Sequence, residues 1–221
     1  YQKADLKKKL SRANQLNIAD QKVFTIAWDI SDHFSETWQG TGLKGQLVCQ
    51  SKLAAVRYKN YLDEIGIVST DLVMSPPDER EGEESAYGNT HEEVKDFWKK
   101  MMNEHGNAKN YEKNIITRFK TQQKPEIIIV VDKLLTGFDA PCNTVLYLTR
   151  NLKDHALLQA IARVNRVYPG KEFGYIIDYY GVLQNLGDAI ENYTGLTEFD
   201  PDDLKGILSN IEREVKKLPQ R

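Results

Sequence analysis

A run of β-branched residues at 126–131, Glu-Ile-Ile-Ile-Val-Val, limits the fold of this chain more than any other feature. After its first residue the run is entirely apolar and does not alternate with polar residues. This pattern is typical of a parallel strand that is buried on both faces of a sheet. We expect four further strands, at 44–51, 68–75, 144–148 and 173–180.

Helices are predicted between these strands. Residues 52–65 repeat apolar side chains at helical spacing and end at Gly66, and residues 154–167 form a second such segment. Because strands and helices alternate, the chain is predicted to be an α/β protein with an open, mostly parallel sheet and flanking helices. In sheets of this kind ligands bind beyond the carboxyl ends of the strands, so we expect a site at that edge.

Three other segments lie outside this alternation. Residues 75–89 are rich in Pro, Gly and acidic residues and predict an exposed loop, followed by helices at 91–103, with Thr90 as N-cap, and at about 109–120. We interpret 75–122 as an insertion. A basic helix at 5–17 and a helical pattern after residue 183 predict extensions at both ends.

The composition is that of an ordinary globular protein, with 40% hydrophobic residues, 28% charged residues and a formal net charge of -2. Cys49 and Cys142 are far apart in the sequence, which fits a reducing, cytoplasmic setting better than a disulfide framework. No apolar run is long enough to cross a membrane. Because the chain begins with Tyr1, we expect it to be part of a longer protein.

A pair of arginines on the predicted helix 154–167 is the first candidate for chemistry. Arg163 and Arg166 are three residues apart and Gln159 precedes Arg163 by four, so all three are expected on one helix face. A guanidinium group binds phosphate oxygens through two parallel hydrogen bonds, as an arginine finger does in phosphoryl transfer. Arginines that are solvated or paired with carboxylates would give the same pattern.

The second candidate is the segment Leu-Leu-Thr-Gly-Phe-Asp-Ala-Pro at 134–141, which follows the buried strand. Gly137 permits close approach of a ligand to the backbone, Asp139 supplies a carboxylate and Pro141 stiffens the exit. Alone, such a segment is usually a turn held by an Asx hydrogen bond.

Together, these motifs resemble those of the restriction (R) subunit of type I restriction enzymes, which belong to helicase superfamily 2. The resemblance is nearly continuous from Lys124 to Gly181 and extends to the segment Lys-Gly-Gln-Leu-Val-Cys-Gln-Ser at 44–51. It implies a RecA-like fold, specifically the second motor domain of an ATP-driven DNA translocase. The domains are then 1–40 as a linking helical segment, 41–182 as RecA-like domain 2, and 183–221 as a C-terminal helical extension.

The resemblance also implies roles for individual residues. Arg163 and Arg166 would reach the ATP phosphates held by a first motor domain, Gln159 would couple nucleotide state to DNA, and Gly137 and Asp139 would line the nucleotide cleft. Many superfamily 2 helicases have Gly immediately before the first of these arginines, where this chain has Ala162.

Contacts with the DNA backbone are implied at the ends of two strands. The candidate residues are Gln50, Ser51, Lys133 and Lys153, with Asp132 and His155 nearby. An N-cap role for Ser51 on the following helix fits the sequence equally well.

A complete motor needs a GxxxxGK[ST] phosphate loop and an acidic magnesium site, and this sequence contains neither. The resemblance therefore implies that ATP and Mg²⁺ are held mainly by a separate first RecA-like domain, and that DNA cleavage belongs to a separate nuclease domain. The implied partners are those domains, double-stranded DNA, and the methyltransferase and specificity subunits. The alternatives are another superfamily 2 helicase, or a non-catalytic module that binds an acidic partner through its arginines.

Overall fold

The computed structural model describes residues 2–77, 88–131, 133–134, 138–152 and 154–181. The chain divides into two compact units, 1–181 and 182–221, and the described residues all lie in the first. The helices of this unit are α1 (Gln2–Thr37), α2 (Lys52–Ile65), α3 (Gly88–His105), α4 (Ala108–Thr121) and α5 (Asp154–Val164). The strands are β1 (Lys44–Val48), β2 (Thr70–Val73), β3 (Ile127–Val130), β4 (Asn143–Leu148) and β5 (Tyr175–Asp178).

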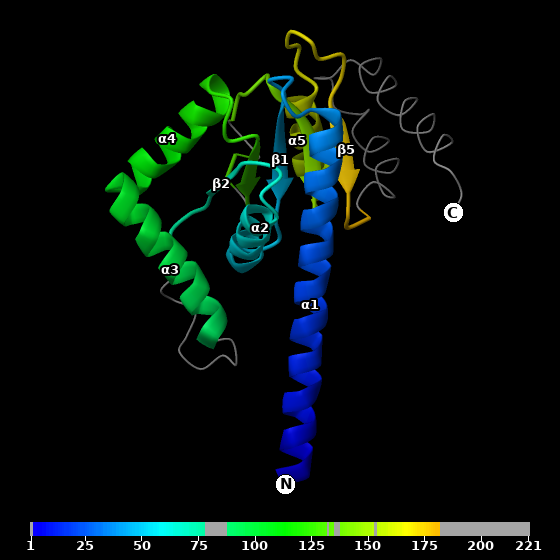
Figure 1. Ribbon diagram of the computed structural model, residues 1–221, viewed down its shortest axis with the longest axis vertical. Helices are drawn as coiled ribbons and strands as arrows, with labels where there is room; N and C mark the ends of the chain where they lie inside the picture. The colour runs from blue at the N-terminus through cyan, green and yellow to red at the C-terminus, as the bar shows by residue number, and fades with distance from the viewer. Residues whose placement is uncertain (1, 78–87, 132, 135–137, 153, 182–221) are drawn as a thin grey trace, which may run out of the picture. The chain divides into compact units, whose positions relative to one another are not determined.

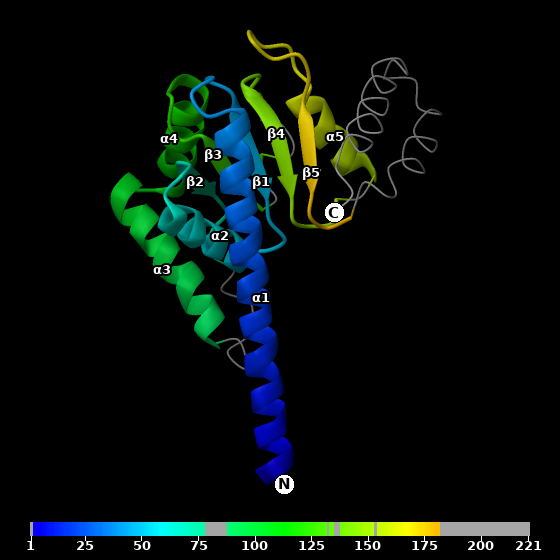
Figure 2. The ribbon, with the colours of Figure 1, turned by 45° about the vertical axis from the view of Figure 1, so that its right-hand side comes forward.

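The five strands form one parallel sheet (Figure 1), and Figure 2 labels them in their order β2-β3-β1-β4-β5. Strand β3 is fully buried, and its Ile127 and Val130 pair with Gly45 and Val48 of the central strand β1. The predicted fold class, an open parallel α/β sheet with flanking helices, is confirmed. Four of the strands are shorter than predicted, by two to four residues each, whereas β4 begins one residue earlier than predicted, at Asn143.

Alternate side chains of each strand point to opposite faces of the sheet, and both faces are covered. Ile127 and Ile129 belong to the core shared with α1 and α2. On the other face, α4 contributes its buried Phe119 and α5 its buried Leu157 and Ile161. Figure 2 shows α1 and α2 on one side of the sheet and α5 on the other.

The N-terminal helix is longer than the sequence predicted. It was expected at 5–17, but it continues as α1 to Thr37. Ile26, Ile30 and Phe34 recur every four residues along α1 and are buried against the sheet. The part of α1 from Ile26 onward therefore belongs to the core of the domain. The predicted linking role of residues 1–40 stays a prediction for the residues before Ile26.

The helix pair α3 and α4 occupies most of the predicted 75–122 insertion. Tyr111 of α4 is buried and its hydroxyl donates to the Leu72 carbonyl of β2, while Trp98 of α3 packs edge-on against the Tyr111 ring. These contacts attach the pair to the edge of the sheet. Within the described residues, no helix is both long and apolar enough to span a bilayer.

Candidate arginine site at the amino edge of the sheet

The arginine segment and the 134–141 segment meet at one edge of the sheet. Strand β4 begins at Asn143, directly after the second segment, and β5 begins at Tyr175, after the loop that follows α5. Because the strands are parallel, both loops lie at the amino edge. The Gly174 Cα lies so close to α5 that a Cβ there would stand 2.2 Å from the Val164 carbonyl oxygen, which fixes the end of α5 at this edge.

Both arginines contact residues of the 134–141 segment, Arg163 through the backbone of Phe138 and Arg166 through the side chain of Asp139. Arg166 Nη1 donates to Asp139 Oδ1 at 2.6 Å, and Arg163 Nη1 donates to the carbonyl oxygen of Phe138. The Arg166 and Asp139 side chains are 47% and 57% exposed, so the pair is open to solvent. Burial, and then the charge of Arg166, lower the pKa of Arg163, but a guanidinium remains charged at any physiological pH.

The sequence predicted this site at the carboxyl edge of the sheet, and that placement is wrong. Helix α5 starts at the carboxyl end of β4 and runs back across the sheet before β5 begins. Its 11 residues carry the chain about 16 Å, at about 1.5 Å per residue, so Arg163 reaches the opposite edge. Helix α5 also ends at Val164, and Arg166 therefore lies two residues beyond the helix on which it was predicted.

Two lysines that were not predicted as site residues, Lys44 and Lys171, hold the loops of this edge together by hydrogen bonds. Lys171 Nζ donates to the carbonyl oxygens of Pro141, at 3.0 Å, and Asn143, at 2.6 Å. It thereby joins the loop that carries Arg166 to the loop that carries Asp139. Burial lowers the pKa of Lys171 to about 8.

Lys44, at the start of β1, is 3% exposed and holds the turn before β3. Its ammonium group donates to the carbonyl oxygens of Gln122, Gln123 and Pro125, which matches its three N–H groups. Burial lowers the pKa of Lys44. A lysine at the start of an apolar strand is the only sequence signal for this arrangement.

The predicted DNA-backbone residues lie at the other, carboxyl edge. Ser51 is the N-cap of α2, and its hydroxyl accepts from the Ala54 amide at 3.1 Å, while Gln50 beside it is exposed. Lys133 forms an ion pair with Glu112 of α4. The structure thus places these residues at the opposite ends of the strands from the arginines, and not in the same site.

The remaining candidates divide between the helix and the undescribed residues. Gln159 lies one turn before Arg163 on α5 and is partly buried. Gly137, Asp132 and Lys153 lie outside the described residues, as does the side chain of His155. In the part of the chain that is described, no cluster of three or more His, Cys, Asp or Glu side chains is arranged to hold a metal ion.

The chemistry open to this edge follows from its charges. Two guanidinium groups, one half-exposed, can donate paired hydrogen bonds to an anion, and the phosphate oxygens of a nucleotide are suitable acceptors. In the structure, Asp139 holds Arg166. The lysine contacts with backbone carbonyls keep both loops in place around the pair.

Comparison with known proteins assigns a family to this architecture. Residues 41–181 match the family model described as type I restriction enzyme subunit R domain 3. The chain is 33% identical over 221 residues to a Methanocaldococcus jannaschii protein described as the type I restriction enzyme MjaVIIP endonuclease subunit, covering 96% of this chain and 20% of the relative. It is 30% identical over 192 residues to the HindI endonuclease subunit of Haemophilus influenzae, covering 81% of this chain and 16% of the relative.

A solved structure shares the fold. It is a fragment described as an HsdR subunit of a type I restriction enzyme from Vibrio vulnificus YJ016, with a TM-score of 0.51 and 20% identity, over 77% of this chain and 30% of that one. The present chain spans a fifth or less of the length of the two sequence relatives named above.

Proposed function

The chain belongs to the family of type I restriction enzyme R subunits, as their domain 3, and from this premise we propose that it is the second RecA-like domain of an ATP-driven DNA translocase. The observation that carries the proposal is the meeting of Arg163 and Arg166 with residues 138 and 139 at a solvent-exposed edge of the sheet. Membership of this family removes the alternative that the chain comes from another kind of superfamily 2 helicase.

In the proposed motor, Arg163 and Arg166 act as arginine fingers. They contact the phosphates of an ATP molecule that is bound, with Mg²⁺, to a first RecA-like domain of the same subunit. Charge that develops on the transferred phosphoryl group is then stabilised by two permanent cations. Gln159, one helical turn away, couples the nucleotide state to DNA.

Asp139 has a double role in this proposal. In the structure it accepts a hydrogen bond from Arg166, and the pair is exposed enough for a phosphate to compete. When ATP binds, Arg166 exchanges Asp139 for a phosphate oxygen, and the freed carboxylate faces the ribose together with Gly137. The pairing with Asp139 keeps Arg166 oriented before the nucleotide arrives.

The other parts of the proposal follow from the family. The partners are double-stranded DNA, a nuclease domain of the same subunit, and the methyltransferase and specificity subunits, in the bacterial cytoplasm. Ser51, Gln50, Lys133 and Lys153 contact the DNA backbone from the carboxyl edge. Of these, Gln50 and Ser51 are exposed at the end of β1, and Lys133 must exchange Glu112 for phosphate.

The test is ATP turnover by the full R subunit carrying Arg163→Ala or Arg166→Ala. We expect a fall on the order of 10³-fold or more, as for arginine fingers in other phosphoryl-transfer enzymes. Arg57→Ala is the matched control, because Arg57 is also paired with carboxylates, Asp20 and Glu93, but lies on α2. Rates within a few-fold of wild type for both site variants would favour the alternative of a non-catalytic binding module.

A further inference from the structure

Helix α4 presents a face made of lysines without a single acidic side chain. Lys109, Lys113 and Lys120 are exposed, and at about 100° per residue they lie within about 40° of one another around the helix. Ile116 lies within about 20° of Lys109 around the helix and carries no charge. We refer to Lys109, Lys113 and Lys120 as the α4 lysine face.

The other charged side chains of α4 are already paired. Glu112 is the one acidic residue of α4, and it forms an ion pair with Lys133. Arg118 pairs with Asp71 of β2. The opposite side of the helix, Tyr111, Ile115 and Phe119, is buried in the domain, so the lysine face is the side of α4 that solvent and partners meet.

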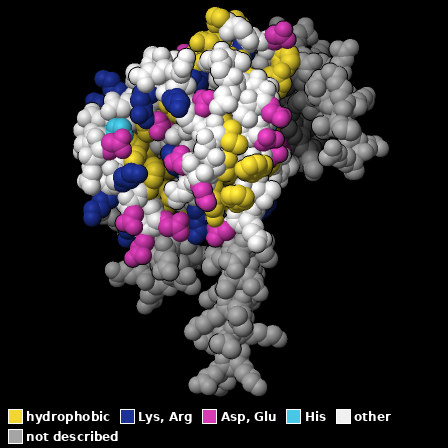
Figure 3. Space-filling model, in the orientation of Figure 1, with side chains coloured by type: hydrophobic (Ala, Val, Ile, Leu, Met, Phe, Trp, Pro, Cys, Tyr) yellow, Lys and Arg dark blue, Asp and Glu magenta, His cyan; other side chains and the backbone are white. Residues whose placement is uncertain are grey.

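The neighbouring helix α3 has as many lysines but a different pattern. Lys95, Lys99 and Lys100 are exposed beside the exposed acids Glu92 and Asp96, which lie three or four residues from them. Their charges are therefore balanced locally. In Figure 3, Lys and Arg side chains gather over α3 and α4, with Asp and Glu side chains among them, and further Asp and Glu side chains lie along α1.

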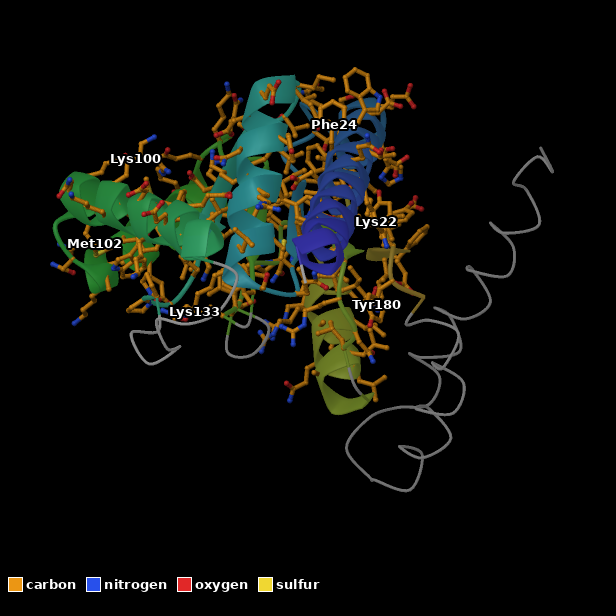
Figure 4. All side chains as sticks on the ribbon, turned by 90° about the horizontal axis from the view of Figure 1, so that it is seen from below. Lys22, Phe24, Lys100, Met102, Lys133 and Tyr180 are labelled. Atoms are coloured by element: carbon orange, nitrogen blue, oxygen red, sulfur yellow. The ribbon has the colours of Figure 1, made fainter. Side chains whose placement is uncertain are left out.

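The α4 lysine face runs along the side of the domain from one edge of the sheet to the other. Lys109 lies at the start of α4, near the edge that holds Lys133, whose position beside the helix pair is labelled in Figure 4. Lys120 lies at the other end, with its ammonium group 5.4 Å from the centre of the Phe138 ring. The 11 positions from Lys109 to Lys120 span about 16 Å at about 1.5 Å per residue.

We propose that the α4 lysine face binds the phosphate backbone of double-stranded DNA, as part of the track along which the motor moves. The proposal rests on the proposed function for the presence of DNA. A row of ammonium groups with no carboxylate among them attracts DNA of any base sequence, because phosphate contacts position DNA without reading its bases. A translocase needs such contacts, since it moves along DNA of varying sequence. The extended basic row fits a duplex backbone better than it fits a compact anion such as a nucleotide.

Salt dependence of DNA binding by the full R subunit tests this proposal. The probe is a duplex of arbitrary sequence, titrated at several salt concentrations with wild type and with the triple variant Lys109→Gln, Lys113→Gln, Lys120→Gln. Each lost phosphate contact lowers the slope of log affinity against log salt by about 1, so the triple variant should lose about 3. The matched control, Lys95→Gln, Lys99→Gln, Lys100→Gln, removes the same charge from α3 and should keep the wild-type slope.

Three other outcomes of these measurements would contradict the proposal. An unchanged slope in the α4 variant, or an equal loss in the α3 variant, would overturn the α4 lysine face as a specific contact. Normal DNA binding with weakened assembly with the other subunits would overturn it in favour of an acidic protein surface. A wild-type subunit that binds no duplex at any salt concentration would contradict the proposed function itself, whereas ATP hydrolysis measured without DNA should be the same in both triple variants and wild type.

Discussion

The Arg166 guanidinium lies 2.6 Å from the Asp139 carboxylate, although the two residues are 27 positions apart in the chain. The contact joins the loop before β4 to the loop before β5 at a solvent-exposed edge. Exposed ion pairs of this kind contribute about 0–1 kcal/mol to stability, because water screens the charges and ordering two side chains costs entropy. The pair is therefore better suited to exchanging partners than to holding the fold together.

We expect Asp139→Asn to lower the free energy of unfolding by less than about 1 kcal/mol. A double-mutant cycle with Arg166→Ala, measured by denaturant unfolding, should give a coupling energy within the same limit, and added salt should reduce it further. The less exposed Arg57–Glu93 pair, at 19% and 38% exposure, serves as the comparison and should couple more strongly. A coupling of several kcal/mol between Asp139 and Arg166 would instead indicate a structural pair.

Gly174→Ala should destabilise the domain and displace the loop that carries Arg166. A Cβ at this position would stand 2.2 Å from the Val164 carbonyl oxygen and 2.9 Å from Val164 Cγ2, so the backbone must move. Overpacking of this kind costs about 1–3 kcal/mol or more. Glu172→Ala, an exposed substitution in the same loop, should be close to neutral, and equal midpoints of thermal unfolding for the two variants would contradict the prediction.

Ile129→Ala should lower the free energy of unfolding by about 2–5 kcal/mol, because it leaves a cavity in a strand that is covered on both faces. Ile129 is 0% exposed, whereas Val167 is 95% exposed. Val167→Ala is therefore the control and should stay within about 0.5 kcal/mol of wild type. Denaturant unfolding followed by circular dichroism gives both values.

The contribution of Lys171 to stability should depend on pH. Burial lowers the pKa of Lys171 from 10.5 to about 8, so the unfolded chain binds this proton more tightly than the folded chain. The contribution of Lys171 to the free energy of unfolding therefore rises as the pH increases from the folded-state pKa, about 8, to the unfolded-state pKa, 10.5. Lys171→Met removes the titration, and wild type should gain stability relative to this variant between about pH 8 and about pH 10.5. Parallel pH profiles for the two proteins would show that Lys171 does not titrate in this window.

Substitutions of Ser51 separate its two candidate roles. Ser51→Ala should cost about 0.5–2 kcal/mol, because the Ala54 amide loses its acceptor, and Ser51→Asp should restore that stability, since Asp is also a good N-cap. If Ser51 also contacts DNA phosphate, the added negative charge of Ser51→Asp will weaken duplex binding by the full R subunit. Full recovery of both stability and DNA binding in Ser51→Asp would leave Ser51 with the capping role alone.

The sheet could be predicted from the sequence because its signals are local. The apolar run at 127–130 specifies a strand covered on both faces, and Ser51 and Gly66 mark the two ends of α2, as the structure has them. The extent of α1 was harder to predict. Ile26, Ile30 and Phe34 form a helical stripe, but polar residues surround them, and only the packing of the stripe against the sheet shows its importance.

The site was predicted less completely, because its position depends on the direction of the chain in space. The sequence predicted that Arg163 and Asp139 belong to one site, but the length of α5 decides at which edge of the sheet that site lies. The supporting lysines gave still less signal. Lys44 and Lys171 bind backbone carbonyls of residues that lie at least 28 positions away in the sequence, and such acceptors carry no side-chain signature.

The strand order has a consequence for how the domain forms as it is synthesised. Strands β1 and β2 do not pair with each other. Each of them pairs with β3, which begins later in the chain, at Ile127. Until the ribosome has released that segment, Leu47 and Leu72 lack Ile129, the residue of β3 with which both pair. Sheet assembly therefore waits until residues 127–130 have been synthesised, and association with chaperones is most valuable before that point.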